Sequence, residues 1–107
     1  MPNSYTNAKV DLTTTSVTTL YTCPGATTAL VKSILVSEDS GNADTITVTI
    51  TNADAAVFSI FKLKAVASNT TVELLSEPLV VTENQVVKVT AATANRLHVV
   101  ASLLEIS

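Results

Sequence analysis

The stretch Thr45-Ile46-Thr47-Val48-Thr49-Ile50-Thr51 decides the fold class, because apolar and hydroxyl residues alternate along it without a break. A repeat of two residues is typical of a β-strand that has one face in the core and the other in water. We therefore predict that Ile46, Val48 and Ile50 point into a core, while the threonines at 45, 47 and 49 face outward. The segments on either side, 38–44 and 52–55, consist mainly of residues that favour turns, so each is predicted to be a hairpin connection.

The rest of the chain continues the same signal. Its 107 residues include 18 Thr, 15 Val and 5 Ile, which together make 38 β-branched residues, a type that suits a pleated sheet better than a helix. Candidate strands recur about every ten residues, which is the rhythm of a sandwich or barrel. They span 8–12, 16–22, 29–37, 45–51, 56–63, 70–75, 78–81, 85–91 and 96–105. We predict one all-β domain over residues 1–107, an antiparallel, jelly-roll-like two-sheet sandwich with about eight strands and almost no helix.

Two of these segments carry apolar residues on both faces of the strand. By alternation, Leu30, Ile34 and Val36 share one face of the first segment, and Val31 and Leu35 share the other. The second segment behaves in the same way, with Leu97, Val99, Ala101 and Leu103 backed by Val100 and Leu104. A sandwich needs only one buried face in each sheet, so we expect either central strands capped by loops or a surface covered by another subunit.

Charge and composition argue against several classes of protein. Only 14% of the residues are charged and 47% are hydrophobic, so the chain is expected to fold. The net charge is −3, and the six basic residues are scattered along the chain, which makes nucleic acid an unexpected partner. Residues 1–5 do not begin a signal peptide, and no apolar run reaches the length of a membrane span, so neither secretion nor a membrane is expected. Cys23 is the only cysteine and excludes an intrachain disulfide.

The residues that could support chemistry are few and isolated. His98 is the only histidine, on the strand face opposite Leu97 and Val99, and no Gly-x-Ser-x-Gly elbow accompanies it. We interpret it as an ordinary strand or interface residue. Cys23 precedes a Pro-Gly turn, has no basic neighbour to activate it, and is expected to be buried and inert. The chain is therefore predicted not to be an enzyme and to have no catalytic residue and no cofactor.

Three further features permit a binding role but favour a structural one. The acidic segment with Glu38, Asp39, Asn42 and Asp44 lacks the ordered spacing of a calcium loop and is interpreted as a solvated turn, so no metal site is predicted. Residues 69–71, Asn-Thr-Thr, match a glycosylation acceptor but are expected to close a turn and begin a strand. The aromatic residues are too few for a carbohydrate or base-stacking platform; Phe58 is expected in the core and Phe61 in the core or an interface.

The segment 20–36, LYTCPGATTALVKSILV, resembles the opening of small virion structural proteins of tailed bacteriophages, including phages of aquatic bacteria and cyanobacteria. The segments 69–75, 78–81, 86–91 and 95–102 are similar to the same group, so the resemblance covers nearly the whole chain. None of these segments carries chemistry, and they are shared among capsid, neck and tail components.

The resemblance implies a virion protein assembled in the cytoplasm of a bacterial host. We expect a capsid decoration or cement protein that forms a homo-oligomer, a trimer, and binds the major capsid protein. One alternative is a neck, tail or baseplate component. A second alternative, of another class, is a carbohydrate- or ligand-binding adhesion module.

Overall fold

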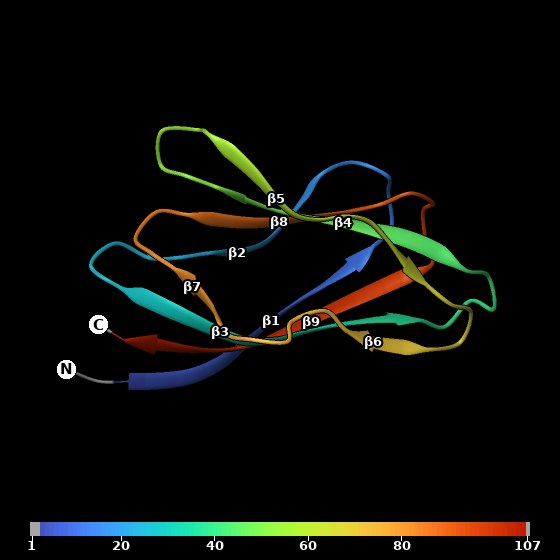
Figure 1. Ribbon diagram of the computed structural model, residues 1–107, viewed down its shortest axis with the longest axis horizontal. Helices are drawn as coiled ribbons and strands as arrows, with labels where there is room; N and C mark the ends of the chain where they lie inside the picture. The colour runs from blue at the N-terminus through green and yellow to red at the C-terminus, as the bar shows by residue number, and fades with distance from the viewer. Residues whose placement is uncertain (1–2, 107) are drawn as a thin grey trace.

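The computed structural model describes residues 3–106, which form nine β-strands and no helix (Figure 1). Among these residues there is accordingly no helix long and apolar enough to cross a membrane. The strands are β1 (Asn3–Leu12), β2 (Thr18–Thr22), β3 (Thr28–Glu38), β4 (Asp44–Thr51), β5 (Val57–Val66), β6 (Thr71–Glu73), β7 (Leu79–Val81), β8 (Val86–Ala91) and β9 (Leu97–Ile106).

The strands form two antiparallel sheets packed face to face, which confirms the predicted sandwich (Figure 1). One sheet has the order β1-β9-β3-β6, with β7 also paired to β3, and the other has the order β2-β8-β4-β5. Along the chain, β1, β2, β3 and β4 lie alternately in the two sheets. β9 then lies between β1 and β3, and β8 lies between β2 and β4, which is the strand order of a jelly roll. The structure has nine strands rather than about eight because the strand beside β3 is interrupted between β6 and β7.

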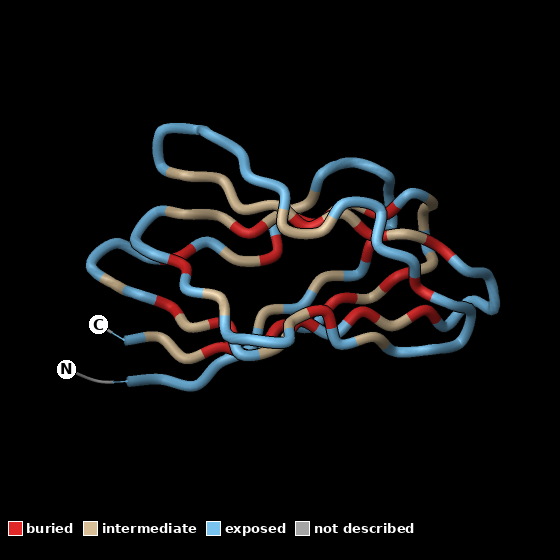
Figure 2. The backbone as a smooth tube through the Cα atoms, in the orientation of Figure 1, coloured by how far each residue is buried: buried red, intermediate tan, exposed pale blue. Residues whose placement is uncertain are grey.

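The core lies between the sheets, where the inward residues of each strand meet (Figure 2). Ile46 and Val48 are fully buried and Ile50 is half-buried against them, whereas the intervening threonines are only partly covered on the outer side. The alternation predicted for this strand is therefore confirmed. The strict alternation also fixes the pairing register of this strand, because a shift of one residue would bring the threonines into the core.

One of the two predicted hairpins is wrong. Residues 52–56 do close a hairpin between β4 and β5, in which Asn52 N donates to Ala56 O at 2.8 Å. Residues 39–43 instead carry the chain from β3 in one sheet to β4 in the other. Turn-favouring residues permit a change of direction, but the sheet that the next strand joins depends on partners distant in the sequence.

The predicted face assignment along β3 is also wrong in part, because a β-bulge interrupts the strand. Val31 pairs with Leu103 and Ser33 with Ser102, so Lys32 is an extra residue. The bulge reverses the alternation: Val31, Ile34 and Val36 all point inward, whereas Leu30 and Leu35 point outward. Leu30 therefore does not share a face with Ile34.

The prediction for the C-terminal segment is confirmed. β9 is a long central strand between β1 and β3, and it buries Leu97, Val99, Ala101 and Leu103. Val100 and Leu104 lie on its opposite, outer face, as the sequence indicated. The outer face of this sheet therefore keeps apolar side chains that the sandwich does not bury.

Candidate interaction surfaces

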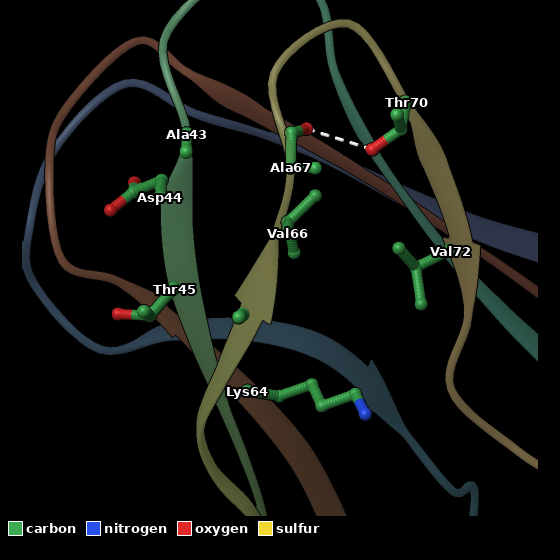
Figure 3. A pocket seen from close by; sticks show the side chains of 9 residues that line it. Ala43, Asp44, Thr45, Lys64, Val66, Ala67, Thr70 and Val72 are labelled. Carbon is green, nitrogen blue, oxygen red and sulfur yellow. Dashed lines mark hydrogen bonds between the residues drawn. The ribbon is translucent and has the colours of Figure 1, made fainter.

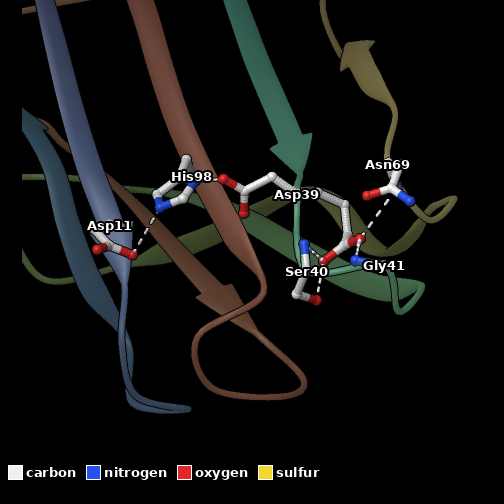
Figure 4. A network of polar contacts seen from close by, with 7 residues as sticks. Asp11, Asp39, Ser40, Gly41, Asn69 and His98 are labelled. Atoms are coloured by element: carbon white, nitrogen blue, oxygen red, sulfur yellow. Dashed lines mark hydrogen bonds and ion pairs between the residues drawn. The ribbon is translucent and has the colours of Figure 1, made fainter.

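His98 lies between two carboxylates on the outer face of the five-stranded sheet (Figure 4). Its Nε2 atom is 3.2 Å from Asp11 Oδ1 in the neighbouring β1, and its Nδ1 atom is 3.5 Å from Asp39 Oδ2. Both ring nitrogens thus face acceptors, so neither is free in this arrangement to take a proton from a hydroxyl nucleophile. The geometry is that of a surface polar cluster in which the imidazole lies between two carboxylates.

The acidic segment is a solvated turn at residues 39–43, as predicted, but the carboxylates at its two ends, Glu38 and Asp44, are buried. Figure 4 shows the contacts around the turn. Glu38 is only 2% exposed, and its carboxylate accepts hydrogen bonds from the backbone N–H groups of Ser40, Gly41 and Asn42 at 2.9–3.1 Å. It also accepts from the Ser40 hydroxyl and from Asn69 N, the latter at 3.1 Å. This carboxylate therefore joins the loop after β3 to the turn before β6, which corrects the interpretation of Glu38 as part of a solvated turn.

The same contacts explain the acidity of Glu38. Burial by itself would raise the pKa of this carboxyl, but the hydrogen bonds from Ser40, Asn69 and Gly41 outweigh it and lower the pKa to about 2. A carboxylate whose oxygens are occupied by backbone donors has little capacity left to bind a cation. The role of Glu38 is therefore to accept hydrogen bonds from backbone N–H groups of two turns.

The other acidic residues of the segment point to different places. Asp44 is nearly buried and accepts a hydrogen bond from Thr93 N at 3.0 Å, so it closes the loop before β9, while Asp39 turns toward His98. No three His, Cys, Asp or Glu side chains in residues 3–106 come together in a way that could hold a metal ion. The loop does not gather its oxygens around one point.

Cys23 is fully buried at the end of β2, and its Sγ donates to Thr27 O at 3.3 Å across the Pro-Gly turn. Burial raises the pKa of its thiol, which favours the unreactive protonated form. The burial expected from the sequence is confirmed.

The Asn-Thr-Thr segment also behaves as predicted. Asn69 has a left-handed backbone with φ of 55°, Thr70 Oγ1 donates to Ala67 O at 2.7 Å, and Thr71 begins β6. Asparagine tolerates this conformation better than most residues, which suits it to close the turn.

β5 is a free edge strand that leaves large apolar side chains in water. Val57, Phe58 and Leu63 are 61%, 54% and 60% exposed, and β4 is the strand's partner on one side. Two register shifts against β4 break the strand's regularity; at one of them Leu63 has φ of 53° and donates its N–H to Thr47 Oγ1 at 3.1 Å. Bulges of this kind are a device that limits indiscriminate pairing at exposed edges.

The expectation that Phe58 belongs to the core is wrong. Phe58 pairs with Ile50 and so shares its inward-facing side, but the tip of the β4–β5 hairpin stands away from the opposite sheet and is exposed (Figure 2). Nothing from the other sheet covers that ring enough to bury it. Phe61, three residues further along, is half-buried against the core, as the sequence allowed.

An open groove of about 660 Å³ lies where β5 and β6 face each other across the edge of the sandwich (Figure 3). Val66 and Val72 contribute apolar surface to it, and the side chain of Lys64 extends toward β6 at one end. Asp44, which also lines the groove, turns its carboxylate to the other side of β4. The groove thus combines an apolar lining with one cation.

The outer faces of the two sheets differ in chemistry. Cross-strand register places Thr47 beside Thr90 and Thr49 beside Lys88 on the four-stranded sheet, a hydroxyl-rich face. The outer face of the five-stranded sheet instead carries seven large apolar side chains: Tyr5, Leu30, Leu35, Val80, Val100, Leu104 and Ile106. Alternation in the sequence indicated part of this face, but Tyr5 and Val80 join it only through the sheet order.

Neither the known protein-family models nor the curated protein sequences match this chain. These comparisons therefore add no support to the resemblance to phage virion proteins, and the function has to be argued from the surfaces described above.

Proposed function

We propose that this chain is a structural subunit of a bacteriophage virion, most specifically a capsid decoration protein that binds the major capsid protein. The observation that carries the proposal is β5, a ten-residue edge strand with Val57, Phe58 and Leu63 exposed. Large exposed apolar side chains concentrated on one edge strand favour a site where another protein binds. A free strand edge adds backbone donors and acceptors that an extended partner segment can pair with.

The chemistry of β5 indicates what the partner segment contains. Lys62 and Lys64 alternate with apolar residues along the strand, so an acidic, apolar segment of the capsid protein would complement it. Many copies bound in this way would stabilise the assembled lattice by mass action, because the decoration protein binds the assembled form and not the separated subunits.

The fold is consistent with this role and with one other class. Jelly rolls occur in viral capsid proteins, in lectins and in cupins, so the fold is an analogy and not an argument for one function. The groove beside Lys64 is the one feature that favours the alternative of a ligand-binding adhesion module. A neck, tail or baseplate subunit would use the same β5 surface and differ in copy number.

The experiment is a quantitative mass-spectrometric copy count on purified particles, combined with variants of the β5 edge. Wild type is expected in hundreds of copies per particle, whereas F58S/L63S is expected at least about tenfold lower because it removes two apolar contacts. The control is Val17→Ser, which removes an equally exposed apolar side chain outside β5 and should leave the count unchanged.

Two outcomes would decide against the proposal. A count of a few to dozens would indicate the neck, tail or baseplate alternative. Absence of the chain from particles, together with saturable binding of a glycan that Lys64→Ala abolishes, would indicate the adhesion module.

A further inference from the structure

We propose that the outer face of the five-stranded sheet is the contact surface of a two-fold symmetric homodimer. This face carries seven large apolar side chains, whereas the outer face of the other sheet presents threonine hydroxyls and Lys88. Apart from the exposed apolar residues of the edge strand β5 and Val17, the large apolar side chains outside the core are therefore concentrated on this one face.

The side chains of this face fall into rows across β1, β9, β3 and the β6–β7 edge, because residues paired in register point to the same side. Three rows matter, each given in the order β1, β9, β3 and edge strand: Asp11, His98, Ser37, Thr71; Lys9, Val100, Leu35, Glu73; Tyr5, Leu104, Leu30, Val80.

These rows are self-complementary about a two-fold axis that runs parallel to the strands, between β9 and β3. Such an axis places β9 of one copy over β3 of the other and keeps each row opposite itself. Val100 then meets Leu35 of the second copy, and Leu104 meets Leu30 of the second copy. At the rim of the same row, Lys9 lies opposite Glu73 of the second copy, so opposite charges face each other twice.

The other way to pack the face against itself is less favourable. A two-fold axis perpendicular to the strands would exchange the two apolar rows and place Glu73 against Val80 of the second copy. Its Oε2 would keep the hydrogen bonds from Ile34 N and Leu75 N, but the carboxylate would lose water without gaining a cation. Lys32 also lies on this face: it leaves β3 at the bulge, and its Nζ lies 5.6 Å from the Tyr5 ring centroid on β1, so its side chain reaches across β9 beside Ser102. The first arrangement has to accommodate this cation against the Tyr5 ring.

The size of the face approaches that of a standard dimer interface. β1 and β9 with ten residues each, β3 with eleven, and β6 and β7 with three each, at about 4.8 Å by 3.3 Å per residue, make a projected surface of roughly 590 Å², against the roughly 800 Å² per partner of a standard interface. Two aligned sheets pack at about −30°, and the long side chain of Lys9 can span the resulting offset at the rim. The Glu73 carboxylate is fixed in place by hydrogen bonds from Ile34 N at 2.9 Å and Leu75 N at 3.2 Å to its Oε2.

A two-fold contact closes at two copies, in place of the trimer expected from the resemblance. The inference is independent of the virion role, since it uses a different surface from β5 and is tested on the purified chain alone.

The test is sedimentation equilibrium of the full chain at micromolar concentrations. The expected mass is twice 11.2 kDa, or 22.4 kDa. Leu104→Lys should raise the dimer dissociation constant at least about tenfold, because it places a charge opposite Leu30 of the second copy. Thr49→Lys, the same kind of change on the outer face of the other sheet, is the matched control and should leave the constant unchanged.

A second measurement tests the register. Equal amounts of the single variants Leu30→Cys and Leu104→Cys, mixed and oxidised, should form the mixed disulfide in preference to either homodimer, because only the mixed pair is opposed across the axis. A monomer at about 100 μM, a trimer, an equal effect of both lysine variants, or no preference for the mixed disulfide would each overturn the inference.

Discussion

Glu38 is the residue that does most to organise the loops at its end of the sandwich. One buried carboxylate satisfies backbone donors from the loop after β3 and from the turn before β6. Each of these N–H groups would otherwise need water or another acceptor, and leaving buried donors unpaired is costly.

We predict that Glu38→Gln lowers the melting temperature at neutral pH by at least about 5 °C, since the neutral amide accepts at one oxygen only and brings unwanted donors. Thermal denaturation followed by circular dichroism measures the change. Asp39→Asn alters the adjacent, exposed carboxyl and should shift the midpoint far less; similar shifts for both would show that Glu38 has no special role.

Because of Glu38, we also predict that the free energy of unfolding decreases at acidic pH. Because the pKa of Glu38 falls from its ordinary 4.5 to about 2 on folding, the unfolded chain binds more protons in this range. The stabilisation is fully present above pH 4.5 and is lost as the pH falls through about 2. In Glu38→Gln this part of the acid dependence should disappear, and an unchanged curve between pH 4.5 and 2 would contradict the assignment.

At the scale of the element, β9 determines whether the sandwich forms. It is the only strand of the described chain that pairs with both β1 and β3, and its four inward apolar residues are fully buried. The chain therefore places an indispensable central strand at its C-terminal end.

Truncation after Asn95 is predicted to abolish folding. It removes two ladders of hydrogen bonds and buried side chains worth roughly 1.5–3 kcal/mol each, against a total stability of about 5–15 kcal/mol for a domain of this size. Loss of the cooperative transition in urea, with an unfolded circular dichroism spectrum, is the expected result. A soluble fragment of residues 1–95 that melts cooperatively would refute it.

At the scale of the whole molecule, nearly all strand pairs join distant parts of the chain. β1 pairs with β9, so that Asn3 lies beside Ile106, and β2 pairs with β8; β4–β5 is the one pairing of consecutive strands among the described residues. Closing such long loops costs entropy before the new contacts can offset it.

We therefore predict folding in the range of milliseconds to seconds, measured by stopped-flow dilution from urea at low protein concentration. Concentration-independent rates in that range would support the prediction and would separate folding of the chain from its later pairing. Completion of folding within about 100 μs would contradict it.

What the sequence determined by itself was local. Strict alternation over residues 45–51 sufficed to place Ile46 and Val48 in the core, because a strand with one wet face allows no other register. The apolar character of residues 97–104 likewise indicated a central strand, and the Pro-Gly turn and the Asn-Thr-Thr turn form where their residues favour them.

What only the tertiary structure decided depended on partners distant in the sequence. The bulge at Lys32 turns Leu30 to the outer face, and the separation of the β4–β5 hairpin tip from the opposite sheet exposes Phe58. The approach of residue 69 gives the buried Glu38 carboxylate a donor from a distant turn. The assembly of Tyr5, Leu30, Val80 and Leu104 into one outer row required the sheet order. Local alternation specifies which side of a strand is apolar, but strand pairing between distant segments decides what that side faces.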